Sequence, residues 1–218
     1  MANVYETELF FSLPDASMHP GGLRLTARAA RLAGLAPGMT VADIGCGAGA
    51  TAAYLQEAFG ARVTGLDVSE KLIARGRLAH PGVRFLRWNG PALPFEDASL
   101  DAAFCECAFS LIGKPEALSR EVFRTLRPGG VFVLSEVCRA PGVPHKGLFS
   151  EEALAGLLEG AGFAIAHRED QTQALRTFAA QLRALGSPEA LGALLCGCLH
   201  TDEEAPSPRL RDLTYLLL

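Results

Sequence analysis

The stretch that decides the fold is Asp43-Ile44-Gly45-Cys46-Gly47-Ala48-Gly49-Ala50, in a chain of 218 residues. It follows a short apolar run, residues 39–44, which is typical of a buried parallel strand, and it opens a helical segment, residues 49–59. Glycines at alternate positions let a chain turn sharply out of a strand and let a ligand approach the backbone where no Cβ intervenes. The stretch therefore predicts a ligand-binding loop between the first strand and a helix of an α/β domain.

The rest of the chain alternates between the same two kinds of segment. Further strands are expected at residues 62–67, 83–88, 100–106, 131–137, 163–168 and 213–218, and helices at residues 23–34, 70–79, 115–126, 150–160 and 171–199, the last split at Gly186-Ser187-Pro188. Strands that alternate with helices, joined by right-handed crossovers, predict an α/β fold: a doubly wound, mostly parallel seven-stranded sheet with helices on both faces. Leu126-Arg127-Pro128-Gly129-Gly130 is expected to be a turn.

Three regions are expected along the chain. Residues 1–34 form an N-terminal helical cap or lid, residues 35–170 form the ligand-binding core, and residues 171–218 supply C-terminal helices, a last strand and a substrate cover. In the first helix, Leu23, Ala27, Ala30 and Leu32 are expected to face inward, and Arg24, Arg28 and Arg31 to face solvent.

The composition narrows the function classes. The chain is 49% hydrophobic with a formal net charge of −4, so it can fill a core without disulfides and lacks the basic surface that nucleic acid or an anionic membrane would need. It has neither an apolar run of membrane-spanning length nor a signal-peptide pattern at its start, which leads us to expect a soluble cytoplasmic protein.

Asp67 is a second feature that supports a ligand-binding role for the glycine loop. It ends the second expected strand, 20 positions after Gly47, where an acid can accept hydrogen bonds from both hydroxyls of a ribose. The alternative is that Asp67 only caps the next helix, but Ser69 already suits that position.

These residues resemble the class I S-adenosylmethionine-dependent methyltransferases, a family with a Rossmann-like fold. Asp43 and the three glycines match the family's loop, Asp67 matches its ribose-binding acid, and Ser99-Leu100-Asp101 and residues 126–130 match the starts of its fourth and fifth strands. The resemblance implies S-adenosyl-L-methionine as cofactor, no metal, and a small-molecule methyl acceptor. The cofactor-binding residues that it implies are Asp43, Gly45, Cys46, Gly47, Gly49, Asp67, Val68, Asn89, Gly90, Pro91 and Glu106.

Two features of the loop residues bear on the choice of cofactor. Asn89 stands where the family often has Asp, and its amide could still bond adenine, or it could simply be a turn residue with positive φ. Asp43 would repel the pyrophosphate of a dinucleotide, whereas it suits a cofactor that carries an ammonium and a sulfonium. S-Adenosylmethionine is therefore favoured over NAD.

Catalysis by methyl transfer needs alignment more than a strong acid or base. Glu106, at the end of the fourth expected strand, is the catalytic candidate: it could bind the ammonium, orient the acceptor or act as a base, or it could be a solvated carboxylate. Glu136 is a weaker candidate. Tyr5, Phe10 and Phe11 could line a lid or pack in the core, and His19 and His145 are expected to be surface histidines in loops.

The six cysteines include two Cys-x-Cys pairs, Cys105 with Cys107 and Cys196 with Cys198. Strand alternation would place Cys105 and Cys107 on one face, with Cys107 and Cys138 close to the acceptor pocket. The pairs are interpreted as buried small residues, or alternatively as thiolates that hold a soft acceptor such as an arsenical. A non-catalytic S-adenosylmethionine-binding or partner subunit is the other functional alternative, and either a monomer or a homodimer is compatible with the sequence.

Overall fold

The computed structural model describes residues 4–8, 12, 16–90, 92–140, 142, 148–185 and 213–218. These residues form a sheet of order β3-β2-β1-β4-β5-β7-β6. Strands β1 to β5 run parallel, β7 is antiparallel to β5, and β6 is antiparallel to β7. Their bounds are β1 Thr40–Ile44, β2 Arg62–Asp67, β3 Arg84–Arg87, β4 Leu100–Glu106, β5 Leu126–Arg139, β6 Glu169–Asp170 and β7 Leu213–Leu217. The expected Rossmann-like α/β class is confirmed.

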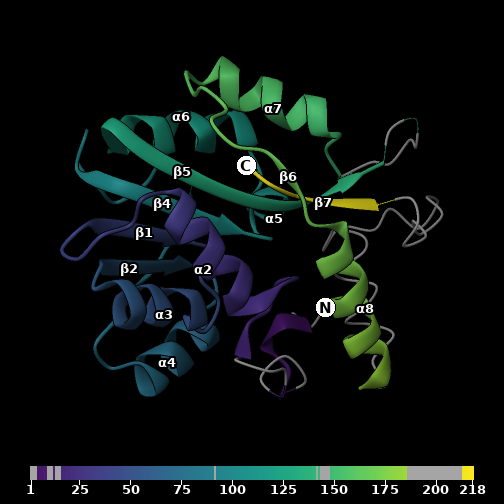
Figure 1. Ribbon diagram of the computed structural model, residues 1–218. Coiled ribbons are helices and arrows are strands. Elements are labelled where there is room, and N and C mark those ends of the chain that lie inside the picture. The colour runs from purple at the N-terminus through teal and green to yellow at the C-terminus, as the bar shows by residue number, and fades with distance from the viewer. Residues whose placement is uncertain are drawn as a thin grey trace.

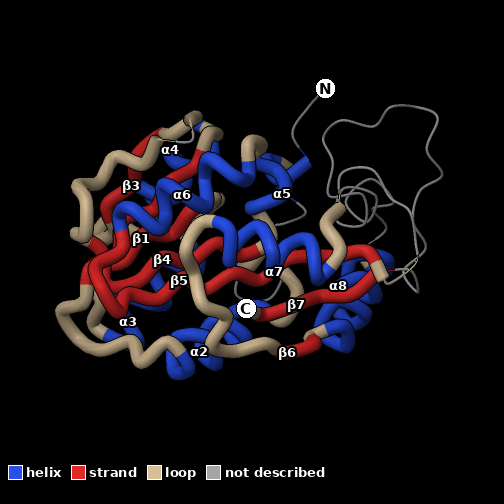
Figure 2. Tube along the Cα trace, turned by 90° about the horizontal axis from the view of Figure 1, so that it is seen from above, coloured by secondary structure: helices blue, strands red, loops and turns tan. Residues whose placement is uncertain are grey.

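Helices cover both faces of the sheet (Figure 1). The helical elements are η1 Val4–Glu6, α2 Gly22–Leu32, α3 Ala50–Phe59, α4 Glu70–Ala79, α5 Phe109–Ile112, α6 Pro115–Thr125, α7 Glu151–Gly160 and α8 Thr172–Ala184. One core cluster joins buried side chains of α2, α3, α4 and α8 to one face, and a second joins α5, α6 and α7 to the other. Figure 2 looks onto the second face and shows α6 and α7 lying over the strands.

The alternation of side chains along the central strands produces the two clusters. On β4, Ala102 and Phe104 belong to the first cluster, whereas Ala103 and Cys105 belong to the second. Because β1 is hydrogen-bonded to both β2 and β4, the strand order reverses at β1, which is where α/β sheets form a ligand crevice at the carboxyl ends of their strands.

Two strand expectations are corrected. Residues 163–168 form no strand. The ring of Phe163 packs instead against Phe123 and Phe132, with ring centroids 5.3 and 5.6 Å apart. The free edge of β5 is paired with β7. Residues 126–130 are not a turn before β5 but an irregular part of it. Leu100 pairs with Leu126 and Ala102 with Val131, so the extra residues bulge out of the ladder.

The inward face of α2 is also different from the one expected. Leu25 and Ala29 are 4% and 1% exposed, whereas Leu32 is 48% exposed and Leu23 is only partly buried. The expected Ala27 and Ala30 are buried, and the three arginines face solvent. The buried stripe is centred on the small residues because α2 packs closely on α3.

Local capping follows the sequence at two helices. Ser69 accepts a hydrogen bond from the Leu72 amide at the start of α4, and Ser150 does the same for Ala153 in α7. The expected helix 171–199 ends at Ala184 within the described residues, and its second half lies outside them. In the part of the chain that the structure describes, no helix has the length and apolarity of a membrane span.

Candidate functional site

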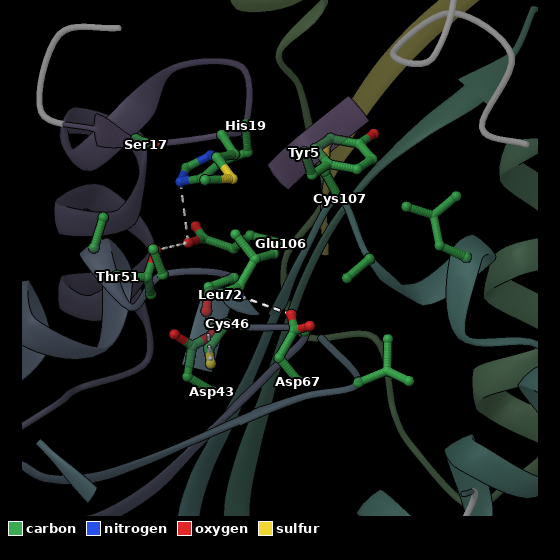
Figure 3. A pocket seen from close by; sticks show the side chains of 18 of the residues that line it. Tyr5, Ser17, His19, Asp43, Cys46, Thr51, Asp67, Leu72, Glu106 and Cys107 are labelled. Atoms are coloured by element: carbon green, nitrogen blue, oxygen red, sulfur yellow. Dashed lines mark hydrogen bonds and ion pairs between the residues drawn. The ribbon is translucent and has the colours of Figure 1, made fainter. Parts of the chain in front are cut away.

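A cavity of about 270 Å³ opens at the carboxyl ends of β1, β2 and β4 (Figure 3). The residues that line it come from the N-terminal segment, the glycine loop, the ends of β2 and β4, and α5: Tyr5, Ala16, Ser17, Met18, His19, Asp43, Gly45, Cys46, Gly47, Ala48, Ala50, Thr51, Asp67, Val68, Leu72, Trp88, Asn89, Glu106, Cys107, Ala108, Leu111 and Ile112. The structure therefore brings most of the expected site residues to one place.

The glycine loop is shaped by close packing. Gly45 has φ 76°, and a Cβ there would lie 2.3 Å from the Cβ of Ala108. Gly49 has φ 86°, and its Cβ would lie 2.4 Å from the ring of Phe85, so only glycine lets α3 approach the sheet this closely. At Gly47 the nearest atom to an added Cβ is the sulfur of Met18 at 3.5 Å, across the cavity. The loop thus presents bare backbone to the cavity at its middle glycine.

Asp67 holds the loop in position. One carboxylate oxygen, Oδ2, accepts the Gly47 amide at 2.9 Å, and the other, Oδ1, accepts the Ser69 amide at 2.8 Å (Figure 3). Burial raises the pKa of Asp67 despite these bonds. Each carboxylate oxygen can accept more than one hydrogen bond, so Asp67 retains acceptor sites for hydroxyl donors in the cavity.

Asp43 is the acid whose charge is least compensated. Its side chain is 2% exposed and, among the described residues, its Oδ2 atom has no hydrogen-bond partner. Burial raises the pKa of Asp43 well above its usual range, and the charges of Glu106 and Asp67 raise it further. An orphaned carboxylate oxygen among three acids fits a ligand that brings positive charge, as the ammonium and sulfonium of S-adenosylmethionine would.

Glu106 is not a solvated carboxylate. It accepts hydrogen bonds from the hydroxyl of Thr26, at 3.0 and 3.1 Å. It also accepts one from the hydroxyl of Thr51, at 2.7 Å, and the Nε2 atom of His19 lies 3.2 Å from it (Figure 3). Its side chain is 3% exposed. These bonds tie the N-terminal segment and α3 to the end of β4.

His19 was expected on the surface, and that expectation is wrong. Its ring is held between the carbonyl of Pro20, 3.1 Å from Nδ1, and the carboxylate of Glu106, and the residue is 5% exposed. The contact between His19 and Glu106 joins residues that are far apart in the sequence, so local sequence patterns carry little sign of it. One signal was available: Thr26 is a polar residue on the inward face of α2, seven positions after His19.

Glu136 does not line the cavity but lies behind it. It is 2% exposed and accepts hydrogen bonds from the Ser110 amide and hydroxyl, at 3.1 and 3.2 Å, and from the Val137 amide at 3.1 Å. Burial raises the pKa of Glu136 to about 7. Burial also raises the pKa of Tyr5, which lines the cavity, and the charges of Cys107 and Glu136 raise it further.

The remaining expected cofactor contacts are only partly described. Val68 and Asn89 line the cavity, Gly90 follows Asn89 without lining it, and Pro91 lies outside the described residues. Asn89 does not have positive φ, so the interpretation of it as a left-handed turn residue is wrong. Tyr5 both lines the cavity and packs against the first core cluster; Phe10, Phe11 and His145 lie outside the described residues.

The cysteines do not converge. Cys105 and Cys138 are buried in the second core cluster, whereas Cys107 packs against the first core cluster and lines the cavity. Strand alternation does not extend to Cys107 because β4 ends at Glu106 and Cys107 has φ 53°. Within the described ranges no group of three or more metal-ligating side chains is present, and Cys196 and Cys198 fall outside those ranges. The thiolate-cluster hypothesis is therefore wrong for Cys105, Cys107 and Cys138.

Comparison with known proteins gives consistent family relationships. Residues 42–134 match the model of a methyltransferase domain family. The chain is 30% identical over 169 residues to phosphoethanolamine N-methyltransferase of Triticum aestivum, covering 70% of this chain and 33% of that protein. It is 35% identical over 130 residues to botryococcene C-methyltransferase of Botryococcus braunii, covering 57% of this chain and 34% of that protein. The chain thus spans about a third of the length of these curated relatives.

Solved structures share the fold. One is phosphoethanolamine N-methyltransferase 2 of Haemonchus contortus, in complex with phosphomonomethylethanolamine and S-adenosylhomocysteine. It has a TM-score of 0.74 at 19% identity, and the alignment covers 98% of this chain and 55% of that one. A putative sarcosine dimethylglycine methyltransferase from Galdieria sulphuraria has a TM-score of 0.73 at 19% identity, with coverage of 89% of this chain and 84% of that one.

Residues 42–134 thus form a methyltransferase domain, and its fold and glycine loop with the two acids Asp43 and Asp67 are similar to those of the class I S-adenosylmethionine-dependent methyltransferases, which use S-adenosylmethionine as cofactor.

Proposed function

We propose that the chain is an enzyme that transfers a methyl group from S-adenosylmethionine to a small-molecule acceptor. The observation that carries the proposal is the cavity at the carboxyl ends of β1, β2 and β4, where buried Asp43 keeps a carboxylate oxygen without a partner among the described residues. An uncompensated, buried carboxylate favours a cationic ligand, because the low dielectric around a buried group strengthens charge interactions.

Each part of the cofactor has a plausible partner in the chain. Asp67 would accept hydrogen bonds from the ribose hydroxyls, since it lies at the cavity with its loop contacts already made. Asn89 would face the adenine, and Asp43 would face the ammonium. The backbone of residues 45–49 would lie against the methionine part, where Gly47 leaves room.

The cofactor supplies an electrophilic methyl group, so the chain's task is to align an acceptor lone pair with it and to exclude water. We propose that Glu106 acts here through its charge: its bonds to Thr26, Thr51 and His19 fix the N-terminal segment beside the cofactor. Those bonds direct the carboxylate toward the N-terminal segment and α3. Residues 1–34 would thus be the cover of the site, as the cavity contacts of Tyr5 and Met18 suggest.

The proposal is tested by incubating the protein with S-adenosylmethionine and a set of small amines, alcohols and thiols, and by measuring S-adenosylhomocysteine release. Turnover that depends on an added acceptor is expected. Binding of S-adenosylhomocysteine without turnover on any acceptor would instead indicate a non-catalytic cofactor-binding subunit.

A further inference from the structure

A second cavity, also about 270 Å³, lies between the N-terminal segment and α8. The residues that line it are Ser17, His19, Gly21, Gly22, Arg24, Gln171, Gln173, Ala174, Thr177, Phe178 and Gln181. The two walls are close: a Cβ on Gly21 would lie 3.5 Å from the Cβ of Ala174.

This cavity adjoins the cofactor cavity. Ser17 and His19 line both cavities, so the two cavities share a wall at these residues. Ser17 is 3% exposed, and within the described chain its hydroxyl has no hydrogen-bond partner. A buried hydroxyl without a partner is costly and is usually satisfied when a ligand or water is bound.

The lining is polar, and its charge is positive. Gln173, Thr177 and Gln181 follow one another at four-residue spacing and therefore share one face of α8. Of the described residues that line the cavity, none is acidic, and Arg24 is its only guanidinium.

Arg24 is available for a ligand, in contrast to its neighbour on α2. Arg28 donates to Glu169 at 2.8 Å, which lowers the pKa of Glu169 through that hydrogen bond. Arg24 makes no ion pair with any described residue. An unpaired guanidinium beside amide and hydroxyl groups is a typical binding arrangement for a carboxylate or a phosphate.

We propose that this cavity holds the anionic end of the methyl acceptor, and that the acceptor is a small amine carrying a carboxylate or phosphate group. Its amine would reach past Ser17 and His19 to the cofactor. The inference rests on the proposed methyltransferase function. In the transfer, the amine lone pair forms the new N–C bond, the S–C bond breaks with its electron pair left on sulfur, and the amine proton passes to water.

Three amines separate the possibilities: sarcosine, which carries a carboxylate; phosphoethanolamine, which carries a phosphate; and ethanolamine, which carries no anion. Each is titrated calorimetrically into protein saturated with S-adenosylhomocysteine, and each is assayed for methylation. Arg24→Gln is compared with Arg28→Gln, a matched arginine on the same helix that does not line the cavity. Ser17→Ala is the third variant.

The expected result is binding and methylation of at least one anionic amine, with weak or no response to ethanolamine. Arg24→Gln should raise the KM and Kd for that amine about ten-fold or more, because one charge-assisted contact is lost. It should leave the affinity for S-adenosylhomocysteine unchanged, as should Arg28→Gln. Whichever of sarcosine and phosphoethanolamine binds more tightly shows whether the cavity holds a carboxylate or a phosphate.

Several outcomes would overturn the inference while S-adenosylhomocysteine still binds, leaving the cofactor proposal intact. The first is that neither anionic amine binds. The second is that Arg24→Gln and Arg28→Gln change the KM and Kd for the amine equally. The third is that an amine binds in a way that depends on Arg24 but is never methylated. Failure of the wild-type protein to bind S-adenosylhomocysteine would remove the proposed function and this inference together.

Discussion

Glu136 should make the protein less stable as the pH rises from about 4.5 to about 7. Its pKa is raised from its ordinary value of 4.5 to about 7, because the carboxyl is buried at 2% exposure. An acid whose pKa is raised by folding binds more protons in the native state than in the unfolded state, so the ionised form opposes folding. The penalty is absent below the unfolded pKa, grows through this interval and is complete above the folded pKa.

The size of the effect follows from the shift. At about 1.4 kcal/mol per unit of pKa, the interval corresponds to roughly 3 kcal/mol of unfolding free energy, as an order of magnitude. Glu136→Gln removes the titration, so the difference in unfolding free energy between variant and wild type should change by this amount across the interval. The pH dependence of this difference is the test, rather than the variant's absolute stability, because the amide of Gln can accept only some of the bonds from Ser110 and Val137.

The assay is urea denaturation of both proteins at intervals from pH 4 to pH 8. The reasoning also links Glu136 to the site, because its contacts with Ser110 hold the start of α5, whose Leu111 and Ile112 line the cofactor cavity. A difference between the two proteins that is constant with pH would refute the argument, whatever its size.

Three further substitutions test separate parts of the site and the fold. Asp43→Asn removes a buried charge, so calorimetry should show S-adenosylhomocysteine binding weakened about ten-fold or more while the thermal midpoint does not fall; a lower midpoint with unchanged affinity would assign Asp43 to structure alone. Gly49→Ala places a Cβ 2.4 Å from Phe85 at φ 86°, so it should lower the unfolding free energy measured by urea denaturation by about 2–4 kcal/mol. Gly34 also has positive φ but has open space around it, so Gly34→Ala should lower it by about 1 kcal/mol. Equal losses in the two variants would count against the packing argument. Ser69→Ala should cost about 1 kcal/mol through loss of the α4 cap, also by urea denaturation, and a negligible change would mean that the cap is replaced.

The sequence was informative where local chemistry decides the structure. The glycine loop, Asp67 at a strand end and the Ser69 cap each act within a few residues or at a fixed place in the strand order, so their positions could be read directly. The parallel sheet followed from the alternation of apolar strands and helices.

Two of the wrong predictions, those for His19 and for residues 163–168, share a physical cause, which is contact between segments distant in the sequence. The burial of His19 depends on Glu106 at the end of another element, and the position of Phe163 depends on ring packing rather than on strand pairing. Cys107 was misplaced because a strand-alternation rule was carried one residue past the end of β4, into a residue with positive φ. None of these is specified by a pattern of neighbouring residues.

The most direct test of the cofactor assignment is calorimetric titration of the protein with S-adenosylhomocysteine and, separately, with NAD. Asp67→Asn is compared with Asp101→Asn, a matched aspartate that also accepts a backbone amide but does not line the cavity. We expect S-adenosylhomocysteine to bind and NAD not to bind, with affinity for S-adenosylhomocysteine reduced about ten-fold or more by Asp67→Asn and unchanged by Asp101→Asn. Binding of NAD without S-adenosylhomocysteine, or equal affinities in the two variants, would contradict the assignment.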